Sequence, residues 1–370
     1  MKYIETVVSL FDGPSMGMLS LNRAGYGVRN YYASEIDKHA IAESKANFPN
    51  IQHMGDVRNL TYFNQRLWRG RWDEANQTVT LNGDSELIHR GPVNLLMGGS
   101  PCQGFSASGK QGGFDDKRSG LFWHFVRLYR QIKAENPQLY VLLENVKMRK
   151  AWSSIITEAM GMEPVLINSA LVGAQNRERN YWTNIPGVVQ PEDKGLALKD
   201  ITEDGKQALG IAQRGRYNEE GVIVQRYECN GKFKSNALTT VGKDTLLFIP
   251  LDSHNSRNGL ECIGGLVNPK FKLWLNDGKI LQRNFSQGNR VYSENGKSAT
   301  LSASSGGLGG KTGLYEIQGV IRKLTKIECC RLQTVPDDFF KVSSDAQAIK
   351  MLGNGWTVDV IAHILSFMPC

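Results

Sequence analysis

Long apolar runs are missing from this sequence of 370 residues. None approaches the ~18 consecutive apolar residues that a membrane-spanning helix needs, so we expect no membrane association. The first five residues, Met1-Lys2-Tyr3-Ile4-Glu5, also lack the basic lead and the long apolar stretch of a signal peptide. Together these absences predict a soluble protein of the cytoplasm.

The sequence also lacks the cysteine spacing of common metal sites. Its six cysteines form no C-x-x-C pair, and none has a histidine at zinc-finger spacing. We therefore predict no metal site. A disulfide framework is also unexpected in a large chain without a secretion signal, so at least one cysteine is a candidate nucleophile.

Composition and charge exclude further classes of protein. With 41% hydrophobic and 22% charged residues, the chain is neither disordered nor collagen-like, and its length favours about two domains. The net charge is +8. Residues 205–315 hold 15 Lys and Arg against 8 Asp and Glu, so most of the excess lies in one region and favours a polyanionic partner there.

The first part of the chain alternates apolar strands with amphipathic segments. Strands are predicted at residues 6–11, 30–34, 93–97 and 139–143, and a helix is predicted near Met16–Ala24. This alternation predicts an α/β fold with a doubly wound, mostly parallel sheet. Ligands of such sheets bind at the carboxyl ends of the strands.

The pattern changes after about residue 183. Residues 205–315 contain 17 of the 39 glycines and short β-type runs between turn signals. Helical periodicity returns near residues 324–332, 344–352 and 358–367. We therefore predict a catalytic domain over 1–182, a smaller inserted β-rich domain over 183–320, and a segment over 321–370 that completes the first domain.

Polar residues follow the predicted strands where such a sheet binds ligands. The turn Phe11-Asp12-Gly13 follows the first strand, and Glu35 ends the second, where an acid can bind ribose hydroxyls. Pro14 and a missing third glycine argue against a pyrophosphate cradle but leave room for a cofactor without phosphates. Asp56 could accept from an adenine amino group or simply cap a helix.

Three further features are candidates for chemistry. Cys102 stands in a Gly/Pro loop after a strand, where a thiol nucleophile would sit; the alternative is a buried structural cysteine. Glu144 follows four apolar residues, a costly place for an acid unless it is paired or functional. Gln175, Arg177 and Arg179 alternate, so on a strand they share one face, either as ligands or as a surface salt-bridge ladder.

Taken together, the ordered motifs of this sequence resemble those of the DNA (cytosine-5)-methyltransferases. The motifs are Phe-x-Gly at 11–13, Ser-Pro-Cys-Gln at 100–103, Glu-Asn-Val at 144–146, Gln-x-Arg-x-Arg at 175–179, Arg-Leu-Gln at 331–333 and Gly-Asn at 353–354. The family's usual Phe-x-Gly-x-Gly-Gly reads Phe-Asp-Gly-Pro-Ser-Met here. Motif details at 11–13, 33–35 and 179–182 resemble the animal de novo branch, but the branch's chromatin-reading extensions are missing. A stand-alone enzyme of a bacterium or bacteriophage is therefore expected.

The resemblance implies a methyl transfer from S-adenosyl-L-methionine to carbon 5 of a cytosine flipped out of duplex DNA. Cys102 would add to carbon 6, Glu144 would contact N3 and the amino group, Arg179 would bind the carbonyl oxygen, and Arg177 would brace a loop or a phosphate. The implied cofactor-binding residues are Phe11, Asp12, Gly13, Glu35, Ile36, Asp56, Val57, Pro101, Leu121, Asn354 and Trp356.

The resemblance further implies a Rossmann-like methyltransferase fold and a target-recognition role for the insertion. We expect a monomer without an obligatory protein partner. Two alternatives stay open: the same chemistry on structured RNA, and a catalytically silent DNA-binding homologue.

Overall fold

The computed structural model describes most of the chain, but Cys102 is not among the described residues. Those residues are 2–101, 120–203, 211–217, 223–229, 247–257, 259–267, 285–301, 313–317, 320–322 and 324–369. The glycine-rich stretch that follows Cys102 in the sequence lies outside them as well.

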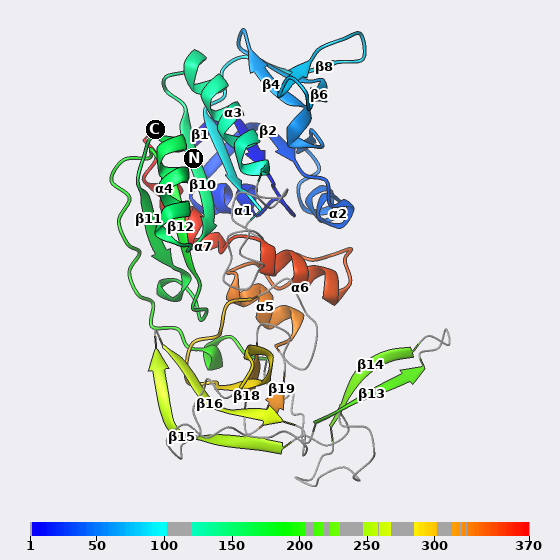
Figure 1. Ribbon diagram of the computed structural model, residues 1–370, viewed down its shortest axis with the longest axis vertical. Coiled ribbons are helices and arrows are strands. Elements are labelled where there is room, and N and C mark those ends of the chain that lie inside the picture. The colour runs from blue at the N-terminus through cyan, green and yellow to red at the C-terminus, as the bar shows by residue number, and fades with distance from the viewer. Residues whose placement is uncertain are drawn as a thin grey trace.

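A seven-stranded sheet forms the centre of the upper part of the molecule (Figure 1). The strand order is β11-β12-β10-β9-β1-β2-β3, in which the last five strands pair in parallel and β12 is antiparallel to both β10 and β11. The predicted doubly wound, mostly parallel sheet is therefore confirmed. The strands are β1 (Lys2–Leu10), β2 (Tyr26–Ser34), β3 (Gln52–His53), β9 (Leu95–Gly99), β10 (Tyr140–Val146), β11 (Pro164–Asn168) and β12 (Glu178–Thr183).

Helices cover both faces of this sheet because its strands are apolar on both sides. Neighbouring residues of β1 enter different clusters: Val7 packs with residues of α1 (Met16–Arg23) and α7 (Val358–Ser366), whereas Val8 packs with residues of α3 (Leu121–Glu135) and α4 (Lys150–Met160). Side chains of a strand alternate between faces, so one strand supplies both cores. The result is a three-layer arrangement.

A second sheet lies at the other end of the molecule in Figure 1. Its order is β15-β16-β17-β18-β19, and a separate hairpin pairs β13 with β14. Tyr292 and Tyr315 of this sheet share an apolar cluster with residues of α5 and α6, so the C-terminal helices pack against both parts. The elements are β13 (Ile211–Tyr217), β14 (Ile223–Cys229), β15 (Leu247–Arg257), β16 (Leu260–Val267), β17 (Arg290–Ser293), β18 (Leu314–Ile317), β19 (Val320–Arg322), α5 (Lys326–Leu332) and α6 (Asp345–Asn354).

A small β unit between β3 and β9 has no counterpart among the predicted elements. It consists of a three-stranded sheet and a hairpin at the top of Figure 1. Its strands are β4 (Leu60–Phe63), β5 (Arg66–Arg69), β6 (Arg71–Asp73), β7 (Thr78–Thr80) and β8 (Glu86–Arg90). Short 3-10 helices occur at Val57–Asn59, Ser169–Leu171, Leu198–Asp200 and Gln287–Asn289.

The end of the chain returns to its beginning. Glu43 of α2 (Lys38–Asn47) is fully buried and accepts hydrogen bonds from the backbone amides of Lys341, Val342 and Ser343 at 2.6–3.0 Å. The hydroxyl of Tyr26 donates to the carbonyl of Met368 at 2.6 Å. These contacts hold the last segment against the first strands and helices.

Gln175, Arg177 and Arg179 do not lie on one continuous strand, so the condition under which they would share a face is not met. Strand β12 begins at Glu178, and Gln175 makes an isolated bridge with Ser298 of the inserted part instead. Pairing with β10 begins at Arg179 and pairing with β11 at Glu178, so Arg177 lies outside the ladder.

Among the residues that the structure describes, no helix is both long enough and apolar enough to cross a membrane.

Replacing Glu43 tests how strongly the two ends of the chain are tied. In Glu43→Gln one carboxylate oxygen becomes an amide nitrogen that cannot accept a backbone N–H, so the free energy of unfolding should fall by about 3 kcal/mol. Urea unfolding measures the change. The matched control is Glu158→Gln at an exposed position of α4, which should stay within about 0.5 kcal/mol of the parent. Equal effects of the two replacements would contradict the proposed tie.

Candidate active site

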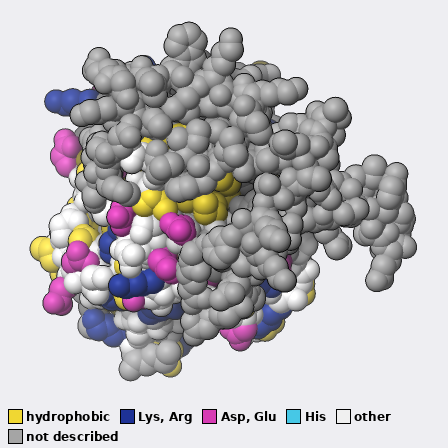
Figure 2. Space-filling view, turned by 90° about the horizontal axis from the view of Figure 1, so that it is seen from below, with side chains coloured by type: hydrophobic (Ala, Val, Ile, Leu, Met, Phe, Trp, Pro, Cys, Tyr) yellow, Lys and Arg dark blue, Asp and Glu magenta, His cyan; other side chains and the backbone are white. Residues whose placement is uncertain are grey.

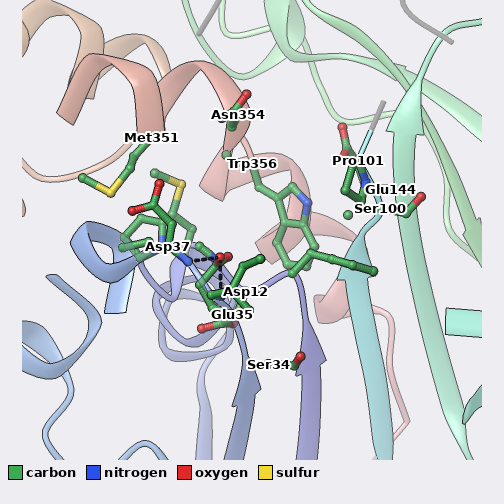
Figure 3. A pocket seen from close by; sticks show the side chains of 18 of the residues that line it. Asp12, Ser34, Glu35, Asp37, Ser100, Pro101, Glu144, Met351, Asn354 and Trp356 are labelled. Carbon is green, nitrogen blue, oxygen red and sulfur yellow. Dashed lines mark hydrogen bonds between the residues drawn. The ribbon is translucent and has the colours of Figure 1, made fainter. Parts of the chain in front are cut away.

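A cavity of about 510 Å³ opens at the carboxyl edge of the central sheet. Its walls come from the ends of β1, β2, β9 and β10 and from the segment around α6. Figure 3 shows Trp356 between an acidic group, which includes Asp12 and Glu35, and a second group formed by Ser100, Pro101 and Glu144. The cavity therefore has two chemically different ends.

The turn after β1 has an unusual backbone. Phe11, Gly13 and Ser15 have φ angles of 56°, 59° and 63°. Glycine adopts this left-handed region freely, whereas other residues pay about 1–2 kcal/mol. Ser15 stands where the family pattern has glycine, and its hydroxyl hydrogen-bonds Asp12 and, at 2.6 Å, the hydroxyl of Ser44. These bonds offset the backbone cost and account for the departure from the family's motif.

Asp12 is a buried acid at the floor of the cavity. It is 8% exposed, and its carboxylate accepts hydrogen bonds from the hydroxyls of Tyr31, at 2.6 Å, and Ser15. Burial raises the pKa of Asp12 to about 6, and the nearby charge of Glu35 also raises it, while the hydroxyl donors lower it. A group that titrates this close to neutrality is sensitive to any charge brought into the cavity.

Glu35 and Asp56 are fixed in different ways. The carboxylate of Glu35 accepts from the backbone amides of Gly13, Ile36 and Asp37 at 2.7–2.9 Å. Asp56 pairs with Arg58 at 2.6 Å. Burial alone would raise the pKa of Asp56, but the hydrogen bonds and the charge of Arg58 outweigh burial and lower it. Both carboxylates are thus fixed in orientation at the wall of the cavity.

An ion pair lies at the other end of the cavity. Glu144 Oε1 lies 3.0 Å from Arg179 Nε, and both side chains are nearly buried. Their backbones are adjacent because β10 and β12 are paired. Gly99 makes room for the carboxylate: a Cβ there would lie 3.0 Å from Glu144 Oε2 and 2.8 Å from Trp356 Nε1.

The neighbour of Glu144 holds the loop that leads to Cys102. The buried side-chain amide of Asn145 donates to Ser100 Oγ at 2.9 Å, and its carbonyl oxygen accepts from the amide of Val146 at 2.8 Å. Ser100 and Pro101 are therefore fixed at the cavity rim, two and one residues before Cys102.

The C-terminal segment closes the cavity. Arg177 is 2% exposed and donates to the carbonyls of Gly353 at 3.3 Å and Gly355 at 2.8 Å. Its guanidinium thereby braces the loop that carries Asn354 and Trp356. The loop-bracing alternative given for Arg177 is the one that matches this geometry.

The structure brings the predicted site residues together in this cavity, except Cys102, which lies outside the described residues. Thirteen further residues line it: Pro14, Met16, Ser34, Asp37, Ala40, Arg58, Gly99, Ser100, Val146, Lys350, Met351, Gly353 and Gly355. Several adjoin predicted residues in the sequence and could have been found that way. Lys350 and Met351 carry no local signal, because only the packing of α6 brings them here.

The cavity suits a nucleoside cofactor without phosphates. Its volume is within the usual range of small-molecule sites, Glu35 is positioned to accept hydroxyl groups, and Ile36 is 71% exposed beside it. Among the described residues, no group of three or more His, Cys, Asp or Glu could hold a metal ion.

A mostly parallel sheet with a cavity at its carboxyl edge is typical of a Rossmann-like fold. The family model for the C-5 cytosine-specific DNA methylases matches residues 5–369. The chain belongs to this family, whose members methylate cytosine in DNA with S-adenosyl-L-methionine as the methyl donor.

Named relatives agree with this family. The chain is 28% identical over 346 residues to the orphan methyltransferase M.Rho11sI of Bacillus phage rho11s, covering 85% of this chain but 61% of that protein. It is 29% identical over 310 residues to the type II methyltransferase M.HhaI of Haemophilus parahaemolyticus, covering 80% and 85%. The expected bacterial or bacteriophage type is confirmed.

Solved structures share the fold. One is a putative DNA modification methyltransferase encoded within an Escherichia coli prophage, with a TM-score of 0.54, 21% identity and coverage of 99% of this chain and 98% of that one. Another is the Entamoeba histolytica methyltransferase EhMeth, with a TM-score of 0.56, 13% identity and coverage of 99% and 98%.

Gly99→Ala tests the close approach between Gly99, Glu144 and Trp356. The new methyl group must displace the carboxylate or the indole, so stability should fall by about 1–3 kcal/mol and methyl transfer should fall further. Thermal unfolding and a tritium-transfer assay measure both. Gly173→Ala is the control, since its Cβ would meet nothing closer than 3.6 Å. Normal activity of Gly99→Ala would show that the cavity tolerates the shift.

Asp12→Asn tests the buried acid through the pH dependence of stability. The pKa of Asp12 in the folded state, about 6, lies above the ordinary value of 3.8 for an aspartate, so the folded state binds the proton more tightly than the unfolded state does. The stability that this proton contributes is present at low pH and is lost as pH rises through 6. The free energy of unfolding of Asp12→Asn minus that of the parent should therefore be higher at pH 8 than at pH 5 by roughly 1–2 kcal/mol.

Urea unfolding at the two pH values measures this difference. The same replacement at Asp84, which is exposed, controls for the change in net charge. A parent–variant difference that is equal at pH 5 and pH 8 would contradict the buried-acid assignment.

Proposed function

We propose that this chain methylates carbon 5 of a cytosine flipped out of duplex DNA, through a covalent bond between Cys102 and carbon 6 of the base. The Glu144–Arg179 ion pair carries the proposal. Its two side chains offer a carboxylate and a guanidinium within 3.0 Å of each other, matching the N3–amino edge and the carbonyl oxygen of cytosine. Pro101, the neighbour of Cys102, lines the same end of the cavity.

The proposed reaction assigns a step to each residue. The Cys102 thiolate adds to carbon 6, which makes carbon 5 nucleophilic, while Glu144 contacts N3 and the amino group and stabilises the adduct by sharing a proton. S-adenosyl-L-methionine supplies the methyl group as its sulfonium. Carbon 5 takes this methyl group and loses its proton to a base, and the electrons of that C–H bond expel the Cys102 thiolate.

The acidic end of the cavity would hold the methyl donor. Glu35 would accept the ribose hydroxyls and Asp56 the adenine amino group. Phe11, Asp12, Gly13, Ile36, Val57, Pro101, Leu121, Asn354 and Trp356 would complete the walls. Asn145 and Arg177 would act as positioning residues, because Asn145 holds Ser100 and Arg177 holds the backbone of Gly353 and Gly355.

We further propose that residues 183–320 recognise the DNA target. The positive charge of residues 205–315 supports this role, although nine of their 15 Lys and Arg lie outside the described residues. On the described part of the face in Figure 2, Lys and Arg side chains are interspersed with Asp and Glu. We place the enzyme in the cytoplasm, acting as a monomer.

The covalent step can be trapped. Duplex DNA in which 5-fluorocytosine replaces cytosine, in a pool of random sequences, should form a denaturant-resistant complex that requires S-adenosyl-L-methionine, because fluorine on carbon 5 cannot leave as a proton does. Cys102→Ser should abolish the complex. Cys262→Ala, at a buried cysteine of β16, should retain it.

Three outcomes would contradict the proposal. A complex that still forms with Cys102→Ser would contradict the assignment of Cys102 as the nucleophile. A complex that forms without S-adenosyl-L-methionine would contradict the proposal that trapping follows methyl transfer. A complex formed with structured RNA but not with duplex DNA would favour the RNA alternative.

A further inference from the structure

Three side chains of α3 hold the chain where the small β unit begins (Figure 1). Arg127 donates to two backbone carbonyls within residues 58–60 at 2.8 and 3.3 Å. Gln131 and Glu135 accept from three backbone amides within residues 62–65 at 2.5–3.1 Å. Residues four positions apart lie on the same face of a helix, so one face of α3 holds this whole stretch of backbone.

Only the Arg127 end of this contact borders the cavity. Among the described residues that line the cavity, three come from the stretch held by Arg127 or directly before it, and none comes from residues 62–65. The three are Asp56, Val57 and Arg58. The carboxylate of Asp56 accepts from the backbone amide of Arg58 at 2.9 Å, so the position of this carboxylate follows the backbone that Arg127 holds.

Trp72 of β6 covers the guanidinium of Arg127. The guanidinium carbon lies 5.2 Å from the centre of the indole ring. The ring of His124 meets the indole edge-on, with 4.6 Å between the ring centres. The indole nitrogen of Trp72 donates to Glu74 at 2.9 Å, and its backbone amide donates to Asn59 Oδ1 at 3.1 Å. Trp72 is therefore fixed over α3 and bonded to the same short stretch of backbone.

Burial strengthens the contact between Trp72 and Arg127. It lowers the pKa of Arg127 to about 10, so the guanidinium stays charged at neutral pH although it is poorly hydrated. A cation over an indole ring is attracted more strongly when it is desolvated. Burial and the charge of Arg127 also lower the pKa of His124 to about 4, so His124 is neutral beside the ring. The ring thus keeps the guanidinium where it reaches the two carbonyls.

We propose that Trp72 and Arg127 are positioning residues that hold Asp56 where it recognises the adenine amino group of the methyl donor. The inference rests on the proposed function, in which Asp56 accepts from that amino group. Trp72 and Arg127 do not line the cavity themselves, so they act through the backbone of residues 58–60. In this role the small β unit serves the cofactor site, and Trp72 is the side chain through which it does so.

A ligand without the amino group measures this role at equilibrium. S-inosyl-L-homocysteine carries a carbonyl oxygen where S-adenosyl-L-homocysteine carries the amino group, so it offers Asp56 no donor at that position. A hydrogen bond to a charged acceptor corresponds to a preference of about tenfold or more. Isothermal titration of the parent should therefore give an affinity for the adenosyl compound about tenfold or more above that for the inosyl compound.

Variants on α3 and β6 should change this preference selectively. Arg127→Met and Trp72→Ala should each reduce it by roughly threefold to tenfold, whereas Trp72→Phe keeps an aromatic ring over the guanidinium and should retain most of it. The matched control is Glu135→Gln, two turns further along α3. It weakens the hold on residues 62–65 and should lower stability, but the preference should stay within about twofold of the parent's.

A double variant tests whether Arg127 acts through Asp56. Asp56→Ala removes the acceptor and should abolish the preference. Adding Arg127→Met to Asp56→Ala should change the preference no further, because two residues that act through one contact are not additive. A further loss in the double variant would show that Arg127 acts by another route and would overturn the inference.

The remaining outcomes separate the inference from the proposed function. If the parent binds neither compound, the proposed function fails at its cofactor. If the parent binds the adenosyl compound but folded Arg127→Met and Trp72→Ala keep its full preference, the inference is overturned and the proposed function stands. An equal loss in Glu135→Gln would assign the effect to the docking of the whole β unit and would also overturn it. Trp72→Ala leaves the hydrogen bonds of Arg127 in place, so it decides the question even if Arg127→Met does not fold.

Discussion

The cavity depends on one buried contact, in which three consecutive backbone amides of residues 341–343 converge on the carboxylate of Glu43. Glu43 lies on α2, directly after the segment that carries Glu35. The amides precede α6, which carries Met351 and Asn354. A carboxylate that accepts several backbone amides is strongly held, so this contact fixes the segment that carries Glu35 relative to the segment that leads into α6. Arg177 makes a similar contact with the opposite charge, because its guanidinium donates to the backbone carbonyls of Gly353 and Gly355 in the same C-terminal segment.

Local charge balance shapes the rest of the site. At the end proposed to hold the base, Glu144 and Arg179 form an ion pair. At the end proposed to hold the cofactor, Asp37 and Asp56 are paired with Lys350 and Arg58, and Glu35 accepts from three backbone amides. Asp12 accepts from the hydroxyls of Tyr31 and Ser15 instead of from a cationic side chain. The two ends of the cavity therefore differ in the charged groups that line them.

Much of the site could be predicted because its signals are local. An acid or a glycine-containing turn directly after an apolar strand is visible in the sequence, and Asp12, Glu35 and Glu144 all have that signature. Lys350 has none, because its place depends on how a distant helix packs. Residues 60–90 form five short strands too brief for a clear period. The alternation of residues 175–179 was misleading, since a strand requires hydrogen-bonded neighbours and these begin only at residue 178.

The contact between Glu43 and Ser343 spans 300 positions of the chain. At a translation rate of about 5–20 residues per second, α2 leaves the ribosome roughly 15–60 s before its partner amides exist. Until then the parallel sheet lacks α7 on one of its faces, and closing so long a loop is a slow step even after synthesis ends. The cavity therefore lacks the walls contributed by residues 350–356 until the last segment of the chain has docked.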